Sequence, residues 1–161
     1  VLHSGIKFSL KMDYPAPFLD YLKQKLKLMQ VRHFEGEFDI PEYTQDAMSA
    51  FYYARTFDYG KMKEGDKISL QNFYKDKTYP LDVRYLGKET IEVPAGEFRC
   101  IKVEPLVQEG GLFKSEGSIV VWMTDDERRM PVKVKTKVII GSIDADLSEY
   151  TGLAGPLKSK K

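Results

Sequence analysis

Alternation of apolar and polar residues, interrupted by short turn sequences, runs from residue 66 to residue 150 of the chain. Apolar side chains at every second position place one face of an extended strand against a core. The pattern predicts six strands with no helix between them, at residues 68–74, 79–85, 98–107, 119–124, 132–139 and 142–150. Consecutive strands of this kind form a meander. We therefore expect a mainly β fold, an antiparallel meander sheet that is strongly curved or closed into a barrel.

Two hairpins also have a predicted register. In the first hairpin, a turn at residues 76–77 places Leu70 opposite Val83 and keeps the apolar side chains on one face of the sheet. In the last hairpin, residues of opposite charge select the register. The predicted charged pairs there are Lys137–Asp144 and Lys135–Asp146.

One helix is predicted over residues 42–55. It follows the sequence Asp39-Ile40-Pro41, and Asp is a good N-terminal cap while Pro is tolerated in the first helical turn. Apolar residues then recur at helical spacing, which gives the helix a buried face. The residues of this face are Tyr43, Ala47, Ala50, Phe51 and Ala54.

We expect a single domain over residues 1–161, since one hydrophobic core suffices at this length. Residues 1–36 fit no single pattern, because the spacing between residues 18 and 29 suits a helix and a strand equally. We interpret residues 1–36 as an incomplete N-terminal part of the same sheet. Residues 152–161 contain Gly, Pro, Ser and Lys, which predicts a flexible tail.

Composition excludes several classes of function. The chain has 25 basic and 24 acidic residues, so no overall charge favours nucleic acid. No apolar run approaches the roughly 20 residues of a membrane-spanning helix, and we expect no transmembrane segment. The single cysteine excludes an internal disulfide and a cysteine-based zinc site.

Several stretches together resemble a known family. They are Phe51-Tyr52-Tyr53-Ala54-Arg55 after the 39–41 sequence, residues 93–103, residues 117–126, Val134-Lys135-Thr136-Lys137 and Gly141-Ser142-Ile143. Over about residues 37–152 the chain resembles an uncharacterised family of exported Gram-negative proteins, domain of unknown function 3108. The resemblance implies a large meander related to the YmcC-type envelope lipoproteins and broadly to lipoprotein carriers. It also implies export to the periplasm or to the periplasmic face of the outer membrane, and no established activity.

Few residues offer catalytic chemistry. His3 and His33 have no metal-binding motif beside them, and Gly110-Gly111 lacks the Lys-Ser/Thr of a phosphate loop. Cys100 alternates within a predicted strand, where a lone cysteine behaves as a small buried apolar residue. We therefore expect no catalysis and no cofactor.

The acidic turn Asp125-Asp126-Glu127 is the strongest chemical candidate. Carboxylates in a turn can bind calcium, and a pair of them can hydrolyse glycosidic bonds. Arg128 and Arg129 follow directly and can neutralise the turn, and Asp is an ordinary turn residue. A solvated turn is the favoured interpretation, and a metal site or a carboxylate-dependent hydrolase is the alternative.

The apolar strand faces suggest a ligand instead. A curved sheet that its helix covers only in part leaves an apolar cavity, which suits an acyl chain. Its expected walls are Leu81, Val83, Tyr85, Trp122, Val134 and Val138. A filled barrel, with the same residues as core, competes with this arrangement and is favoured over it. The expected partners are a lipid or lipoprotein ligand, or alternatively a component of envelope or surface-polysaccharide assembly for which the protein is a scaffold.

Overall fold

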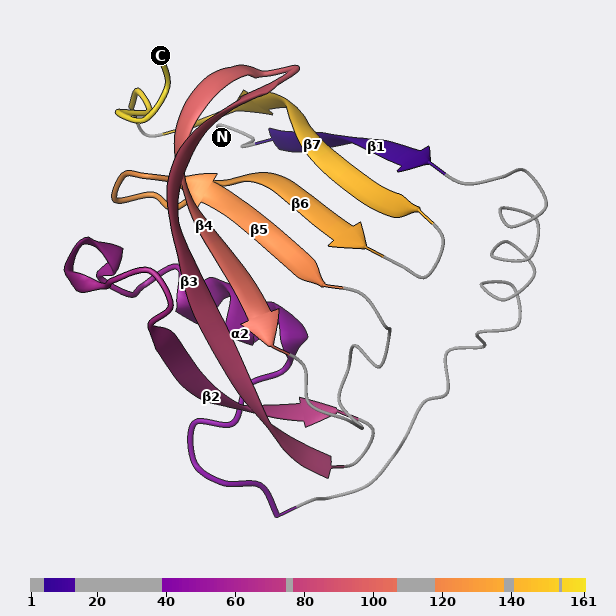
Figure 1. Cartoon of the computed structure of the whole chain (residues 1–161), viewed down its shortest axis with the longest axis vertical. Coiled ribbons are helices and arrows are strands. Elements are labelled where there is room, and N and C mark those ends of the chain that lie inside the picture. Colours follow the sequence, from indigo (N-terminus) through magenta and orange to yellow (C-terminus); the bar gives the residue numbers. More distant parts are fainter. Residues whose placement is uncertain (1–4, 14–38, 75–76, 107–117, 138–140, 154) are drawn as a thin grey trace.

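The computed structural model describes residues 5–13, 39–74, 77–106, 118–137, 141–153 and 155–161. Within these ranges the chain forms seven strands, one α-helix and one 3-10 helix (Figure 1). Their bounds are β1 Gly5–Asp13, α2 Ala47–Ala54, η1 Tyr59–Lys61, β2 Lys67–Tyr74, β3 Lys77–Val93, β4 Gly96–Leu106, β5 Ile119–Thr124, β6 Pro131–Lys137 and β7 Ser142–Thr151.

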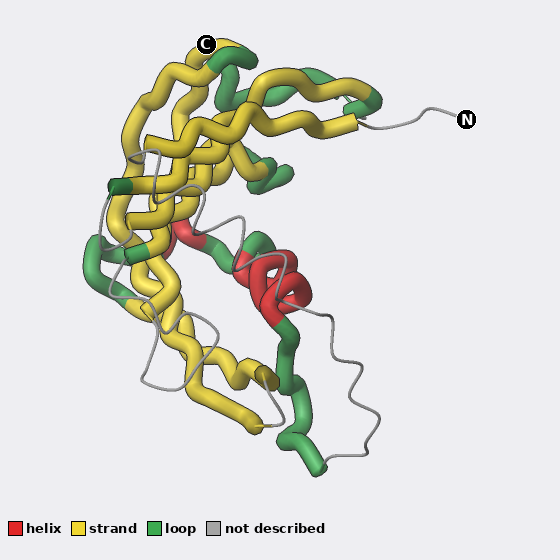
Figure 2. Tube along the Cα trace, turned by 90° about the vertical axis from the view of Figure 1, so that its right-hand side faces the viewer, coloured by secondary structure: helices red, strands yellow, loops and turns green. Residues whose placement is uncertain are grey.

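All described strands belong to one antiparallel sheet. Their order is β1-β7-β6-β5-β4-β3-β2, so β2 to β7 form a six-stranded meander and β1 is added beside β7. This order confirms the predicted mainly β class and the antiparallel meander with one helix. The two outermost described strands, β1 and β2, are not paired with each other, and the sheet is therefore not closed into the barrel that we considered. The tube in Figure 2 shows the helices to one side of the strands.

The register of the β2–β3 hairpin differs from the prediction by two residues. Leu70 lies opposite Leu81, and Ile68 rather than Leu70 lies opposite Val83. The pairing continues to Tyr74 and Lys77, so the strands are connected more tightly than we expected. Because a shift of two residues leaves every side chain on its own face, the sequence pattern does not distinguish the two registers.

The β6–β7 hairpin shows the same kind of shift. Lys135 lies opposite Asp144, and Lys133 lies opposite Asp146. The Lys133 Nζ atom is 2.7 Å from an Asp146 carboxylate oxygen and 3.7 Å from Asp144. Opposite charges do face each other across these strands, but the predicted pairs were wrong. Because lysines alternate along β6 and aspartates along β7, a register shifted by two residues also pairs opposite charges. Lys137 therefore lies opposite Ser142 and not opposite Asp144.

Helix α2 is shorter than predicted, because Asp46 caps it and Asp39 does not. One carboxylate oxygen of Asp46 accepts hydrogen bonds from the backbone N–H groups of Met48 and Ser49, both at 2.8 Å. The Ser49 hydroxyl accepts one from the Asp46 backbone at 2.8 Å, which completes a capping box. Tyr43 lies outside the helix with a φ of 63° and is 81% exposed, so its predicted place on the buried face was wrong. Ala50 and Ala54 are buried as predicted.

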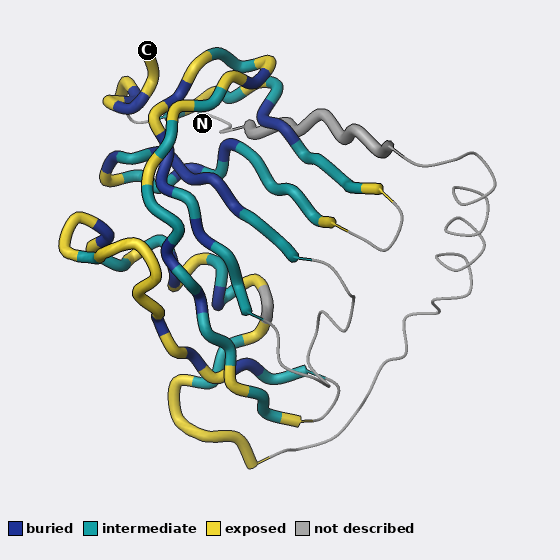
Figure 3. Tube along the Cα trace, viewed as in Figure 1, coloured by how far each residue is buried: buried dark blue, intermediate teal, exposed yellow. Residues whose placement is uncertain are grey.

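Buried side chains form two clusters, one on each face of the sheet. Figure 3 marks the buried positions along the strands. Neighbouring residues of a strand point to opposite faces, so Val121 belongs to one cluster and Trp122 to the other. The α2-side core contains Ala50, Tyr59, Ile68, Leu70, Val83, Tyr85, Ile101, Val103, Val121 and Met123. The opposite core contains Val93, Phe98, Cys100, Trp122, Met130, Val132, Leu147 and Leu157. The nearly continuous apolar sequence of β5 follows from this burial on both sides.

The turn between β3 and β4 contacts a distant strand. The Ala95 backbone N–H donates a hydrogen bond to the carbonyl oxygen of Leu147 in β7, at 3.1 Å. The end of this long hairpin therefore reaches past β5 and β6 and covers part of the opposite core. None of the helices in the described part of the chain is long and apolar enough to cross a membrane.

The C-terminal segment packs against the sheet, contrary to our expectation of a flexible tail. Leu157 is 8% exposed and Ser159 is 1% exposed. The Arg99 N–H donates to the Ser159 carbonyl at 2.8 Å, and the Lys161 N–H donates to the Glu97 carbonyl at 3.0 Å. These bonds extend the sheet beside the start of β4, where β5 has already ended. Buried Leu157 and Ser159 alternate with exposed Lys158 and Lys160, as in an extended segment that has one face on a core.

We predict that Leu157→Ala lowers the free energy of unfolding by about 2 kcal/mol, since it removes a buried apolar side chain from the opposite core. Urea denaturation followed by circular dichroism measures this loss. Lys158→Ala is the matched control, because that side chain is 72% exposed and a surface ion pair contributes little. Equal effects of the two substitutions would contradict the docking of this segment.

Candidate functional site

The residues predicted to line an apolar cavity do not all lie together. Val83 and Tyr85 belong to the α2-side core, and Leu81 and Val134 pack against it. Trp122 lies in the opposite core, so it shares no wall with them. Val138 lies outside the described residues, as do His3, His33 and Gly110-Gly111. The four residues that come together are packed under α2 and η1, and entry of a ligand between them stays a prediction.

Trp122 makes polar contacts of its own. Its indole N–H donates to the Glu89 carboxylate, and the Lys102 ammonium lies 5.3 Å from the centre of its ring. Lys102 also lies 3.4 Å from Glu89. The side chain is 7% exposed, and these contacts satisfy its only hydrogen-bond donor within a core position.

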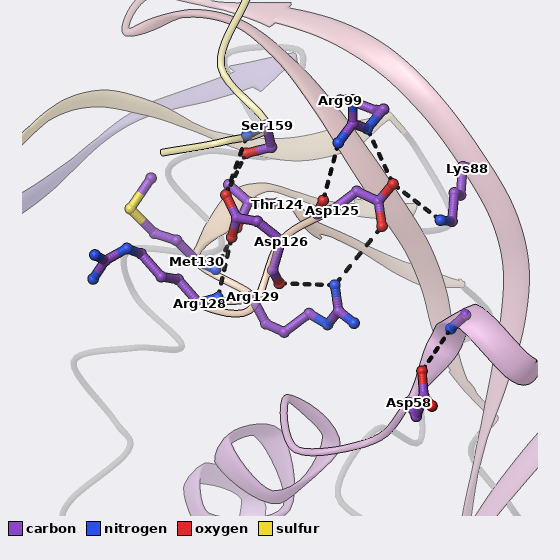
Figure 4. Close-up of polar contacts among 11 residues, drawn as sticks. Asp58, Lys88, Arg99, Thr124, Asp125, Asp126, Arg128, Arg129, Met130 and Ser159 are labelled. Atoms are coloured by element: carbon purple, nitrogen blue, oxygen red, sulfur yellow. Dashed lines mark hydrogen bonds and ion pairs between the residues drawn. The ribbon is translucent and has the colours of Figure 1, made fainter. Parts of the chain in front are cut away.

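The acidic turn between β5 and β6 is occupied by contacts within the protein (Figure 4). One oxygen of Asp125 lies 3.0 Å from the Lys88 ammonium and 3.1 Å from Arg99, and its other oxygen lies 3.7 Å from Arg129. Among the described residues, no three His, Cys, Asp or Glu side chains are grouped so that they could hold a metal ion. The single carboxylate of Asp125 thus pairs with three cations, so positive charges outnumber negative charges around the turn.

Asp126 is the buried member of the turn, with 8% exposure. It accepts hydrogen bonds from the hydroxyls of Thr124 and Ser159, both at 2.8 Å, and from the Arg128 backbone N–H at 3.1 Å. Burial opposes its ionisation, but these bonds more than offset it and keep its pKa below the ordinary value. Asp126 thus joins the turn to the C-terminal segment. Glu127 is exposed and pairs with Lys158 at 3.0 Å.

A pocket of about 560 Å³ opens between the end of α2 and this turn. Arg55 connects the two elements, because its Nε and Nη2 atoms donate to the carbonyl oxygens of Arg129 and Arg128 at 2.9 and 2.8 Å. The lining residues are Tyr52, Arg55, Thr56, Phe57, Asp58, Glu127, Arg128 and Arg129. Three arginines, Arg55, Arg128 and Arg129, therefore line this pocket, here called the arginine pocket. The sequence predicted Arg128 and Arg129 only as charges that neutralise the acidic turn. It did not place Arg55 near the turn, because Arg55 lies 73 positions before Arg128.

Arg129 adopts a backbone conformation that is rare for a residue with a side chain, with a φ of 48°. Its Nη1 atom donates to the Asp126 carbonyl at 2.8 Å, and its guanidinium lies 5.6 Å from the centre of the Tyr59 ring. Together with Asp125, these contacts hold the turn in this conformation. The carbonyls that accept the hydrogen bonds of Arg55 are fixed as a result.

The outer surface of α2 and its approach carries large apolar side chains in solvent. Exposed single apolar residues are common, but a contiguous group is not. The group, here called the α2 surface, consists of Ile40 at 49% exposure, Tyr43 at 81%, Met48 at 65%, Tyr52 at 57% and Tyr53 at 46%. Tyr52 borders the arginine pocket described above. Tyr53 borders a second pocket of about 500 Å³ with Phe57, Met62, Asp66, Lys67, Ile68 and Ser69.

Comparison with known families identifies the chain. The model of the family described as "Protein of unknown function (DUF3108)" matches residues 23–148, more than half of the sequence. The chain belongs to this family. No curated protein and no solved structure matches it. The family assignment confirms the resemblance noted in the sequence, while the closer relation to YmcC-type lipoproteins stays a prediction.

We predict that Cys100 of this DUF3108 protein is inert in the folded state. The side chain is fully buried, and burial, helped by the negative charges of Glu89, Asp125 and Asp126, raises the pKa of its thiol to about 12. Iodoacetamide at pH 8 should leave the native protein unmodified and alkylate it fully in urea, as measured by mass spectrometry. Rapid modification of the native protein would contradict the packing around β4.

We predict that the contribution of Asp126 to stability depends on pH. Because its folded pKa lies below the ordinary 3.8, the ionised carboxylate stabilises the fold above about pH 4, and this contribution is lost as the pH falls through the folded pKa. Asp126→Asn should lower the free energy of unfolding by about 1.5–3 kcal/mol at pH 7. Urea denaturation at pH 7 and below pH 4 should show the difference from wild type shrink. Glu127→Gln, on an exposed side chain, is the control and should change little at either pH.

Proposed function

We propose that this DUF3108 protein is an exported envelope protein that acts by binding an amphipathic ligand, without catalysis of its own. The α2 surface carries the proposal, since five large apolar side chains stand 46–81% exposed on one short segment. Leaving such side chains in water is unfavourable, and a concentration of exposed apolar residues within one segment supports a binding role.

The two pockets favour an amphipathic ligand as the occupant of this surface. They are open hollows next to the end of α2, with volumes of about 560 and 500 Å³, lined by Tyr52 in one case and Tyr53 in the other. Tyr52 and Tyr53 each combine an apolar ring with a polar hydroxyl, which suits a ligand that has both characters. In this arrangement the charged residues that line the two pockets contact the polar part of the ligand, and the two tyrosine rings cover its apolar part.

A partner protein is the second candidate. Tyr43 and Ile40 are exposed on the approach to α2 and line neither of the two pockets described. Exposed apolar side chains at this end of the helix suit a scaffold role in envelope or surface-polysaccharide assembly, the alternative that the sequence suggested. The hydrolase alternative has less support, because the carboxylates of the acidic turn are held by cations and hydroxyls of the protein itself.

Export to the periplasm or to the periplasmic face of the outer membrane belongs to this proposal. Membership of the DUF3108 family supports it through the resemblance to exported proteins. Cell fractionation of the protein expressed from its complete gene tests the location. Recovery of the unprocessed full-length protein in the cytoplasm would contradict export.

We predict that Met48→Ser combined with Tyr52→Ser weakens the binding of a fluorescent long-chain fatty acid at least about tenfold. The loss follows from removing apolar contact area, at roughly 25 cal/mol per Å². Fluorescence titration measures the binding, and circular dichroism checks the fold. Both side chains are more than half exposed, so the variant should remain folded.

Leu153→Ser is the matched control, because Leu153 lines a different pocket with Tyr150 and Pro156. It should bind the fatty acid as wild type does. Equal weakening in both variants, or no binding by the wild type, would contradict an amphipathic ligand on the α2 surface. Organic extraction of natively purified protein, followed by lipid mass spectrometry, then identifies what is bound.

A further inference from the structure

Positive charge is concentrated where the arginine pocket meets the β5–β6 turn. Five cations lie at the turn and the adjoining end of α2, of which Lys88, Arg99 and Arg129 pair with Asp125. The cations are Arg55, Lys88, Arg99, Arg128 and Arg129. Asp126 is satisfied by hydroxyls and backbone N–H groups, so Asp125 is the carboxylate that pairs with cations. This excess makes the pocket attractive to an anion.

The other two acidic residues of the pocket do not cancel this excess. Asp58 lies 3.0 Å from the Lys61 ammonium, and Glu127 lies 3.0 Å from the Lys158 ammonium. Each carboxylate thus has its own lysine. Arg129 also interacts electrostatically with Asp58, whereas neither Arg55 nor Arg128 forms an ion pair with these two carboxylates in the described part of the chain.

Two of the three arginines are held in place before any ligand arrives. Arg55 donates to two backbone carbonyls and lies with its guanidinium 5.2 Å from the centre of the Tyr52 ring. Arg129 is fixed by Asp125, by the Asp126 carbonyl and by the Tyr59 ring. Groups that are already ordered lose little conformational entropy when a ligand binds.

Arg128 is the arginine that is available. Its backbone N–H bonds to Asp126, but no acidic side chain in the described part of the chain forms an ion pair with its guanidinium. The side chain is half-buried at the wall of the pocket, beside Gly155 of the C-terminal segment. A guanidinium presents a planar fork of donors that matches a carboxylate or a phosphate.

We infer that the arginine pocket holds the anionic group, a phosphate or a carboxylate, of the amphipathic ligand, with Arg128 as its direct contact. Arg55 and Arg129, which also line the pocket, supply further positive charge. The apolar part of the ligand lies along Tyr52 and toward Met48 on the α2 surface. This inference rests on the proposed function and assigns the chemistry of the ligand's polar end.

Two amphiphiles with the same alkyl chain test the assignment by isothermal titration calorimetry below their micelle-forming concentrations. Dodecyl phosphate carries an anionic head group and dodecyl maltoside a neutral one, and inorganic phosphate serves as a third probe. The wild type should bind dodecyl phosphate about tenfold more tightly than dodecyl maltoside, as charge-assisted hydrogen bonds predict. Added salt should reduce this preference.

Arg128→Gln should remove the preference for dodecyl phosphate and leave the affinity for dodecyl maltoside unchanged. Lys137→Gln is the matched control, because it removes one positive charge at the far end of β6. It should leave the affinities for both amphiphiles as in the wild type. Arg128 forms no ion pair within the described residues, so its substitution should preserve the melting temperature.

The possible outcomes separate this inference from the proposed function. If both amphiphiles bind equally and Arg128→Gln changes neither affinity, the anion site is wrong while the proposed function stands. If neither binds, the proposed function and the inference fail together. If inorganic phosphate alone binds as tightly as dodecyl phosphate, the pocket takes a free anion and the amphipathic ligand is wrong.

Discussion

Asp126 is the buried carboxylate on which the arrangement around the β5–β6 turn depends. Its hydrogen bonds with Thr124 and Ser159 join a central strand to the C-terminal segment, and its bond with the Arg128 N–H fixes the turn. A buried charge is tolerated only when hydrogen bonds replace the lost water, and here two hydroxyls and two backbone N–H groups do so without a cation. The basic side chains nearby therefore form no ion pair with Asp126 in the described part of the chain. The same interaction that stabilises the turn leaves its arginines for other contacts.

Burial of the sheet on both faces limits where a ligand can bind. In the middle of β4 and β5, Ile101 and Val121 pack on one side while Cys100 and Trp122 pack on the other. Strands filled on both sides offer no open apolar face, so the exposed apolar side chains of the described residues are found outside the strands, on the α2 surface. Binding is accordingly proposed at the helix and the adjoining turn, where side chains are held by a rigid sheet but remain accessible.

Sequence patterns predicted that six strands follow one another but missed the second half of β3, which continues to Val93 rather than ending at Tyr85, and they predicted the registers poorly. The bounds of β5 agree with the prediction at both ends, because turn residues flank a continuous apolar run. The registers of β2–β3 and β6–β7 were each wrong by two residues. A period of two is unchanged by a shift of two, so neither apolar alternation nor the Lys–Asp alternation determines which register forms. The helix start failed for a local reason, since two aspartates compete as caps and each has a possible capping-box residue three positions later, Glu42 or Ser49. Only Asp46 forms the cap in the structure, and the sequence does not distinguish the two.

The sequence by itself determined the fold class, the meander order and the family, because these follow from local periodicity and from motifs close together in the chain. Only the tertiary structure decided which face each core residue occupies, how the C-terminal segment packs and where the arginines meet. Trp122 illustrates the assignment of faces, because the pairing of the strands places it on the opposite face of the sheet from Leu81. Arg55 illustrates the last, since its contacts with Arg128 and Arg129 join residues 73 and 74 positions apart. Such contacts arise from the packing of a helix against a distant turn, and no local pattern in the sequence encodes them.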